Sequence, residues 1–317
     1  MYHYVRDFGR NRYPAIKGLD TELFRKQLIF LKTNFNIVRM EDVISTLSGG
    51  EDLPHNAVLL TFDDGYIDHY TTVFPVLDEI GIQGSFFPPS MILETNLLLD
   101  VNKIHFTLAT GETSLVYELL LKEIEFYRGS EYEIPETQVL LRDYAVSDCF
   151  DSGEVVFIKH MLQTVLPERL RCIIADKMFR RFVGVEETTF ARELYCDIAQ
   201  LTTMKNHGMF IGLHGSSHGW LGNMKEIDYE LDVRRALDFM DNVGLIDKKA
   251  WVMNYPYGSW SNGVVNFIRK NNCRLGLTTK VGVADLRVDD LLLLPRLDTN
   301  DFYPKSDNYL KFQKSIA

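Results

Sequence analysis

The sequence of 317 residues has an ordinary globular composition, with 46% hydrophobic and 25% charged residues, which is enough apolar content for a large core. Its formal net charge of −10 argues against nucleic acid as the main partner, because phosphate binding requires a basic surface field. The N-terminal residues lack a basic region followed by an apolar run, and no apolar stretch is long enough to span a bilayer. These features predict a cytoplasmic protein without a membrane span.

The first ninety residues or so alternate between short apolar stretches and amphipathic segments. Asp20 or Thr21 can cap a helix at about 22–34, because apolar side chains recur on one face of that segment. The run Ala57-Val-Leu-Leu-Thr-Phe62 lies between Pro54 and Asp-Asp-Gly, which is typical of a buried parallel strand. The other elements expected here are strands at 2–5, 35–40 and 84–87 and helices at 41–48 and 70–80.

Residues from about 95 to 198 have a different character, with helical periodicity and without the short strand–helix alternation. The clearest helical patterns are at 114–127 and 156–166. We expect this segment to be a helical insertion, which could act as a lid, within one catalytic domain formed by residues 1–317. A separate small helical domain is the alternative.

The alternation resumes after residue 205, with strands expected at 209–213, 250–254, 274–278 and 291–295 and helices at 225–243 and 263–271. Repeated strand–helix units place successive strands in the same sheet with the same direction. The pattern therefore predicts an α/β fold with a mostly parallel sheet, either a barrel or doubly wound.

The motif Thr61-Phe62-Asp63-Asp64-Gly65 places two adjacent carboxylates at the C-terminal end of a predicted buried strand. In parallel α/β folds, ligands bind and catalytic residues gather at that end. The repulsion between the two anions is relieved if one binds a cation, and the other can then act as a base. Taken alone, Asp-Gly after a strand is mainly a turn signal.

Two further motifs follow predicted strands. In His214-Gly-Ser-Ser-His218, two histidines four apart would lie on one side of a helical turn, so both could reach one Zn²⁺ or related ion. A chance pair among eight histidines is the alternative. Asn254-Tyr255-Pro256-Tyr257-Gly258 predicts a rigid turn that could direct a backbone N–H at an oxyanion, or simply end a strand.

Together, the three motifs favour a catalytic site over a chance arrangement of these residues. One aspartate and two histidines form a ligand set that leaves coordination positions open for water and substrate. The remaining aspartate would lie beside the activated water as its base. Such a site is equipped for metal-assisted hydrolysis of an amide or an ester.

In this order, T-F-D-D-G, H-x-x-x-H and Y-P-Y-G resemble the successive motifs of polysaccharide deacetylases, the NodB-homology or carbohydrate esterase 4 family. The opening Tyr2-His-Tyr-Val and the segment 24–32 are similar to N-terminal elements of that family. The resemblance covers about residues 1–92 and 205–300. It implies a distorted (β/α) barrel of about seven parallel strands and leaves the insertion unexplained.

The resemblance also implies a role for each motif residue. Asp63 would be the general base, and Asp64, His214 and His218 would hold one divalent metal ion. The ion would be Zn, with Co, Ni or Mn as alternatives. Tyr257 would supply a backbone N–H to the oxyanion.

The sequence departs from the family pattern at two points. Asn254 stands where many members have an arginine that pairs with the catalytic aspartate, and Arg296 is the predicted replacement, with a surface ion pair as the alternative. No histidine follows His218, whereas many members take their acid from a late L-x-H motif. A subgroup that deacetylates poly-N-acetylglucosamine uses the histidine of Y-H-x-V, so His3 is the predicted acid, and a buried structural histidine is the alternative.

The sequence thus predicts a metal-dependent carbohydrate deacetylase, a hydrolase that cleaves the carbon–nitrogen bond of an acylated amino sugar. A cytoplasmic location favours a nucleotide-linked or lipid-linked substrate, an intermediate in the synthesis of a surface polysaccharide such as O-antigen or lipopolysaccharide. One alternative is hydrolysis of a small non-sugar amide. The other is a non-catalytic member that binds glycan.

Overall fold

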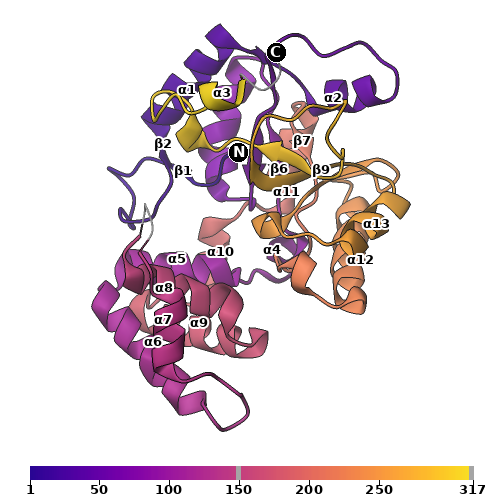
Figure 1. Ribbon diagram of the computed structural model, residues 1–317. Coiled ribbons are helices and arrows are strands. Elements are labelled where there is room, and N and C mark those ends of the chain that lie inside the picture. Colours follow the sequence, from indigo (N-terminus) through magenta and orange to yellow (C-terminus); the bar gives the residue numbers. More distant parts are fainter. Residues whose placement is uncertain (148–150, 314–317) are drawn as a thin grey trace. The chain divides into compact units, whose positions relative to one another are not determined.

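The protein contains two compact units, as seen in a computed structural model that describes residues 1–147 and 151–313 (Figure 1). The first, which we call the α/β unit, comprises residues 1–7, 18–96 and the chain from 191 onward. The second, which we call the helical unit, comprises residues 8–17 and 97–190. Each unit has its own cluster of buried apolar side chains, as expected for parts that each exclude water from a core.

The strands of the α/β unit pair in parallel throughout the described ladders. Two sheets of three strands consist of β5 (Thr61–Asp63), β6 (Ser85–Phe87) and β7 (Phe210–Ile211), and of β8 (Trp251–Asn254), β9 (Cys273–Val281) and β10 (Leu294–Arg296). Two pairs consist of β1 (Val5–Arg6) with β2 (Leu19–Asp20), and of β3 (Asn36–Ile37) with β4 (Ala57–Val58). The predicted α/β fold is confirmed, whereas closure of a barrel stays a prediction.

The helices expected in the α/β unit at 22–34, 41–48, 225–243 and 263–271 begin and end within two residues of those bounds, and the one expected at 70–80 is a π-helical turn at His69–Val73 followed by α3 (Phe74–Glu79). The side chain of Asp20 accepts a hydrogen bond from the Glu22 N–H at the start of α1 (Thr21–Asn34), as the capping pattern predicted. The remaining helices are α2 (Met40–Leu47), α4 (Ser90–Thr95), α11 (Ile198–Asn206), α12 (Glu226–Asn242), α13 (Asn262–Lys270) and α14 (Leu310–Gln313). The helices α4, α11 and α14 were not expected.

Several predicted strands are shorter or shifted in the structure. The strand expected at 2–5 is an isolated bridge between Tyr2 and Phe62 followed by β1, and the strand expected at 209–213 is reduced to β7. The strand expected at 35–40 is reduced to β3, because α2 begins at Met40, where the side chain of Asp42 accepts a hydrogen bond from the Arg39 N–H. The run 57–62 is divided between β4 and β5, because it changes its hydrogen-bonding partner. In its first half, the Val58 carbonyl accepts a hydrogen bond from the Val38 N–H. In its second half, the Leu60 carbonyl accepts one from the Ser85 N–H.

The helical unit is built mainly from helices, as the periodicity of residues 95–198 predicted. They are α5 (Asp100–Thr110), α6 (Thr113–Tyr127), α7 (Thr137–Tyr144), α8 (Gly153–His160) and α9 (Glu168–Phe182), and α10 (Glu187–Leu194) leads from this unit into the α/β unit. Tyr13, from the short segment 8–17, packs its ring against Phe106 and Phe190. The helical unit therefore includes a segment that the sequence had not assigned to it.

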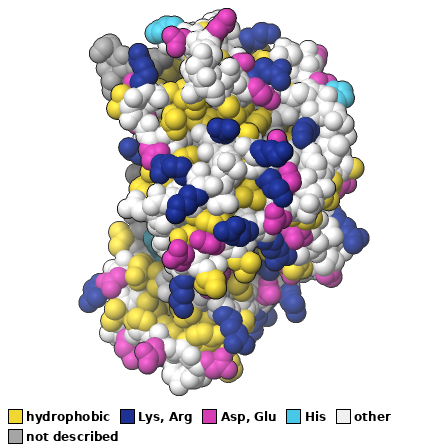
Figure 2. All heavy atoms as spheres, turned by 90° about the vertical axis from the view of Figure 1, so that its right-hand side faces the viewer, with side chains coloured by type: hydrophobic (Ala, Val, Ile, Leu, Met, Phe, Trp, Pro, Cys, Tyr) yellow, Lys and Arg dark blue, Asp and Glu magenta, His cyan; other side chains and the backbone are white. Residues whose placement is uncertain are grey.

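The surface carries both signs of charge. Figure 2 shows one face on which Lys and Arg side chains are interspersed with Asp and Glu. Within the described residues, no helix is long and apolar enough to cross a membrane.

Candidate metal centre and active site

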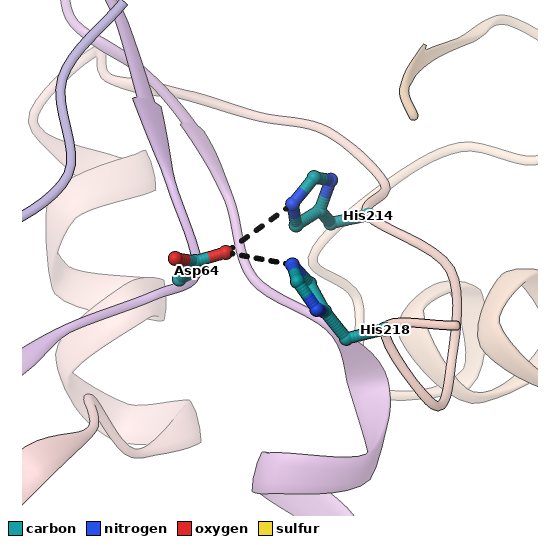
Figure 3. Close-up of side chains that lie close together, drawn as sticks. All are labelled: Asp64, His214 and His218. Carbon is teal, nitrogen blue, oxygen red and sulfur yellow. Dashed lines mark ion pairs between the residues drawn. The ribbon is translucent and has the colours of Figure 1, made fainter. Parts of the chain in front are cut away.

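Asp64, His214 and His218 meet in the interior of the α/β unit (Figure 3). Asp64 directly follows β5, and His214 follows Leu213, which forms a parallel bridge with Met253 of β8. The Nε2 atoms of His214 and His218 lie 3.3 and 3.1 Å from Oδ1 of Asp64. Their ligand atoms all lie within 4.8 Å of one another, and all three residues are buried. The structure therefore brings together the three residues that the sequence predicted as metal ligands.

The donor set fits a divalent cation. Oδ1 of Asp64 is buried and, among the described residues, has no hydrogen-bond partner. Nδ1 of His214 lies 2.6 Å from the Asn254 carbonyl, to which it must donate, so in the neutral ring Nε2 presents a lone pair toward Asp64. Two ligand atoms that each lie about 2.1 Å from one tetrahedral ion are roughly 3.4 Å apart, close to the separations seen here. Converging lone pairs at this spacing are what a small metal ion needs.

Electrostatics favour the protonation states that bind metal. Burial alone would raise the pKa of Asp64, but His218 and His214 beside it hold that pKa well below its ordinary value. Burial lowers the pKa of His218, and the neighbouring Asp64 offsets this only in part. A carboxylate and a neutral imidazole are the forms that act as ligands.

The loop that carries the two histidines is not the helical turn that the sequence predicted. Residues 214–218 are irregular, and Gly215 and His218 have left-handed backbone conformations, with φ of 68° and 57°. Asp232 of α12 holds the loop, accepting hydrogen bonds of 2.8 Å from the N–H groups of both Ser216 and Ser217. A Cβ at position 215 would lie 2.8 Å from Oδ1 of Asp232, so glycine is required there. The imidazoles thus converge through an anchored loop, and helical spacing plays no part.

Asp63 lies beside the metal ligands and is paired with Arg296. Two hydrogen bonds of 2.9 Å join Nη1 and Nη2 of Arg296 to the two carboxylate oxygens, the bidentate geometry that suits a guanidinium. Burial raises the pKa of Asp63, but Arg296 and then His3 oppose it, and the net result is a pKa lowered to about 2. Asp63 is therefore ionised throughout the neutral range.

Every N–H of Arg296 faces a protein acceptor. Nε donates to the Thr278 carbonyl at 2.8 Å. Nη1 also donates to Oγ1 of Thr61 at 3.1 Å, and Nη2 also donates to Oδ1 of Asn254 at 2.8 Å. A guanidinium has five N–H donors, so none remains for a substrate oxyanion. The geometry makes Arg296 an orienting group for Asp63. It does so in place of the arginine that many family members carry where this chain has Asn254.

His3 lies near Asp63. Its Nε2 is 3.8 Å from Oδ2 of Asp63, and its side chain is 43% exposed, which excludes the alternative of a buried structural histidine. Hydrogen bonds between Tyr2 and both Thr61 and Asp63 hold this segment against β5. His69 also donates from Nε2 to the His3 carbonyl at 2.9 Å. The role of His3 as an acid stays a prediction.

Tyr257 lies beside the metal ligands. Its ring meets His218 edge-on at 4.6 Å and stacks on Trp220 at 4.3 Å between ring centroids. Tyr257 has a left-handed φ of 56°, and Asp64 and His218 have φ of 74° and 57°. Such conformations cost free energy in residues other than glycine and gather at functional sites. The contribution of the Tyr257 N–H to an oxyanion stays a prediction.

Three contributors to the site were not found from the sequence: Tyr66, Trp220 and Asp232. Tyr66 donates from its hydroxyl to Oδ2 of Asp64 at 2.7 Å, and its only signal is its place directly after Asp-Asp-Gly. Asp232 is an acidic residue on the buried, mostly apolar face of α12, and a polar residue in such a position is a signal that could have been used. Trp220 follows the histidine motif without a distinguishing pattern.

Known sequences resemble parts of this chain. Residues 181–276 match the family model described as polysaccharide deacetylase, a range that includes His214, His218 and Tyr257. A segment of 78 residues is 37% identical to the poly-beta-1,6-N-acetyl-D-glucosamine N-deacetylase of Escherichia coli K12, and to the same enzyme of Escherichia coli O157:H7. That segment is 24% of this chain and only 11% of those relatives.

Solved structures share the fold over nearly the whole chain. The Streptococcus pyogenes deacetylase PplD in complex with acetate has a TM-score of 0.59 at 16% identity, with 98% of this chain and 94% of that chain covered. IcaB from Ammonifex degensii has a TM-score of 0.55 at 18% identity, with 97% and 94% covered. At these identities the likeness establishes the fold. The resemblance that the motifs predicted is therefore confirmed: residues 181–276 match the polysaccharide deacetylase family model, and nearly the whole chain shares the fold of these solved structures.

Proposed function

We propose that this protein is a metal-dependent hydrolase that removes the acetyl group from an N-acetylated amino sugar. The observation that carries the proposal is the convergence of Asp64, His214 and His218 with the ionised Asp63 at their side. The metal would be Zn²⁺, with Co²⁺, Ni²⁺ or Mn²⁺ as alternatives, because two imidazoles and one carboxylate suit these ions. We further propose that the whole chain is one catalytic domain, a distorted barrel with a helical insertion at about 95–198.

When bound, the ion would act as a Lewis acid that polarises the amide carbonyl and makes water more acidic. Asp63 would accept the proton of the attacking water. Its pKa of about 2 keeps it in the basic form at neutral pH, and Arg296 fixes the direction of its oxygens. Asp63 is a weak base, so the transfer depends on the increased acidity of the water.

The leaving nitrogen must receive a proton, because an amide anion is too basic to depart. His3 is the group that we assign to this task, since it is partly exposed and lies 3.8 Å from Asp63. A protonated imidazole is a common proton donor in catalysis. The Tyr257 N–H would support the oxyanion from the rigid turn beside His218.

The substrate that we propose is a glycan containing N-acetylglucosamine. The name of the Escherichia coli relatives, which describes an enzyme acting on poly-beta-1,6-N-acetyl-D-glucosamine, supports this choice. A nucleotide-linked or lipid-linked intermediate of surface polysaccharide synthesis is the competing substrate, as expected for a cytoplasmic enzyme. The two differ in what flanks the acetylated sugar.

Metal analysis combined with acetate release tests the proposal. The purified protein should contain about one equivalent of divalent metal, and it should release acetate from β-1,6-linked N-acetylglucosamine oligomers faster than from a nucleotide-linked N-acetylglucosamine. His214→Ala should lose the metal, whereas His207→Ala, at an exposed histidine that pairs with Asp78, should keep it. Wild-type protein that binds none of the four metals would refute the proposal. Faster release from the nucleotide-linked sugar would reverse the choice of substrate.

A further inference from the structure

The two oxygens of Asp64 have different environments. Oδ1 faces the two histidine Nε2 atoms and has no hydrogen-bond partner in the described part of the chain. Oδ2 accepts a buried hydrogen bond of 2.7 Å from the hydroxyl of Tyr66. A single carboxylate is thus divided into one oxygen directed at the metal position and one oxygen held by the protein.

Tyr66 is held firmly in place. Its side chain is fully buried, and its ring stacks on Tyr4 at 4.0 Å and on Tyr195 at 6.1 Å between centroids. Its backbone is clamped as well, because the Cys196 N–H donates to the Gly65 carbonyl at 2.9 Å and the Cys196 thiol donates to the Tyr66 carbonyl at 3.1 Å. The hydroxyl therefore has a fixed direction toward Asp64.

We propose that Tyr66 is a positioning residue that makes Asp64 a ligand through Oδ1 alone. This inference rests on the proposed metal site. Turning the carboxylate to bring Oδ2 to the ion would break the Tyr66 hydrogen bond in a buried setting, where a lost partner is costly. Partners of this kind orient ligands and tune metal affinity.

The consequence of binding through one oxygen is an open coordination sphere. A bidentate carboxylate would occupy a second position that water or the amide oxygen needs in hydrolysis. It would also favour larger ions such as Ca²⁺, which accept bidentate carboxylates and many oxygen ligands. Tyr66 would therefore act on both the affinity of the site and the kind of ion that it takes.

The test is Tyr66→Phe, which removes only the hydroxyl. Metal-free full-length protein is titrated with Co²⁺, and binding is followed by calorimetry and by visible absorption. We expect the Kd of the variant to rise about 10- to 100-fold. We also expect weaker visible absorption, because a freed Oδ2 can enter the coordination sphere and raise the coordination number.

Tyr255→Phe is the matched control. It removes another fully buried hydroxyl, which donates to the Leu292 carbonyl at 2.9 Å, and it should leave the Kd for Co²⁺ and the absorption unchanged. An unchanged Kd and spectrum in folded Tyr66→Phe would overturn the inference while leaving the metal site intact. Wild-type protein that fails to bind Co²⁺ and Zn²⁺ would instead overturn the metal site itself.

X-ray absorption of the wild-type protein with Zn²⁺ gives a result that does not depend on whether the variant folds. We expect a single carboxylate oxygen at the ligand distance, with the carboxylate carbon at the longer distance that a single-oxygen contact produces. Two oxygens of one carboxylate at the ligand distance would contradict the inference.

Discussion

In the helical unit, the ammonium group of Lys103 is buried among three carboxylates, Oε1 of Glu187 at 3.0 Å, Oδ1 of Asp100 at 3.5 Å and Asp176. In the α/β unit, Oδ1 of Asp64 is buried without a hydrogen bond and faces two imidazole nitrogens. The first cluster is complete, since a buried cation has anions around it. The second leaves Oδ1 of Asp64 without such a partner among the described residues, an arrangement that the proposed metal ion would complete. Buried charge is therefore balanced by the chain itself in one unit and left open for the proposed ligand in the other.

The same contrast holds between neighbouring residues inside the site. Both carboxylate oxygens of Asp63 accept hydrogen bonds from Arg296. In Asp64, one oxygen accepts a hydrogen bond from Tyr66 and the other faces the two histidines. A carboxylate oxygen with a hydrogen-bond donor from the protein can be held in place before the substrate arrives. An oxygen without such a donor can bind a ligand. The predictions that follow alter one side of this contrast at a time.

The largest effect is expected from Asp63→Asn, which removes the proposed base and keeps the shape of the side chain. We expect kcat for acetate release to fall by about 10²- to 10⁴-fold, the usual contribution of a positioned acid or base. Metal content should stay at the wild-type level, whereas Asp64→Asn should lose metal as well as activity. Asp63→Asn with more than a tenth of wild-type kcat would rule out Asp63 as the base.

A smaller effect, on stability alone, is expected from Lys103→Met. This change leaves three partly exposed carboxylates without their cation, and we expect a loss of about 1–3 kcal/mol in the free energy of unfolding. Urea denaturation measures the loss, and Co²⁺ titration of the folded variant should give the wild-type Kd. A variant that weakens metal binding without loss of stability would show that this cluster is not purely structural.

His69 should make the free energy of unfolding depend on pH, with an effect of similar or smaller size. Burial lowers the pKa of His69 to about 4, and the hydrogen bond to the His3 carbonyl offsets this only in part. An unfolded histidine titrates near 6.5, so between these values the unfolded chain binds a proton that the folded chain does not. The free energy of unfolding must therefore fall as the pH falls through this window, by about 2 kcal/mol from this residue at pH 5.

The measurement compares urea denaturation of metal-free wild-type protein and His69→Gln at about pH 7.5 and pH 5. Glutamine does not titrate, and its amide can still donate to the His3 carbonyl. We expect the loss of stability between the two pH values to be smaller in the variant. His214 and His218 are common to both proteins, so equal losses would mean that His69 does not carry the effect.

The sequence could predict what depends on neighbouring residues. The capped helix α1, the strand that ends at Asp63, the aspartate pair and the two histidines were all found from local pattern or from the resemblance. It could not predict which partner each half of the run 57–62 would choose, because that choice depends on β3 and β6, which lie outside the local pattern of the run. The shape of the loop at 214–218 was predicted wrongly for the same reason: a side chain on α12 decides it.

Asp232 offers the smallest effect and the finest test of how that loop is set. Asp232→Asn keeps one acceptor oxygen for the Ser216 or Ser217 N–H and sets an amide donor against the other. We expect a loss of about 1–2 kcal/mol in the free energy of unfolding, the cost of an unsatisfied buried N–H. The Kd for Co²⁺ should rise about tenfold, as for other groups that orient ligands. Asp238→Asn, at an exposed position on the same helix, should change neither quantity. Wild-type metal affinity in Asp232→Asn would mean that the loop holds its histidines in place without this anchor, through the left-handed residues alone.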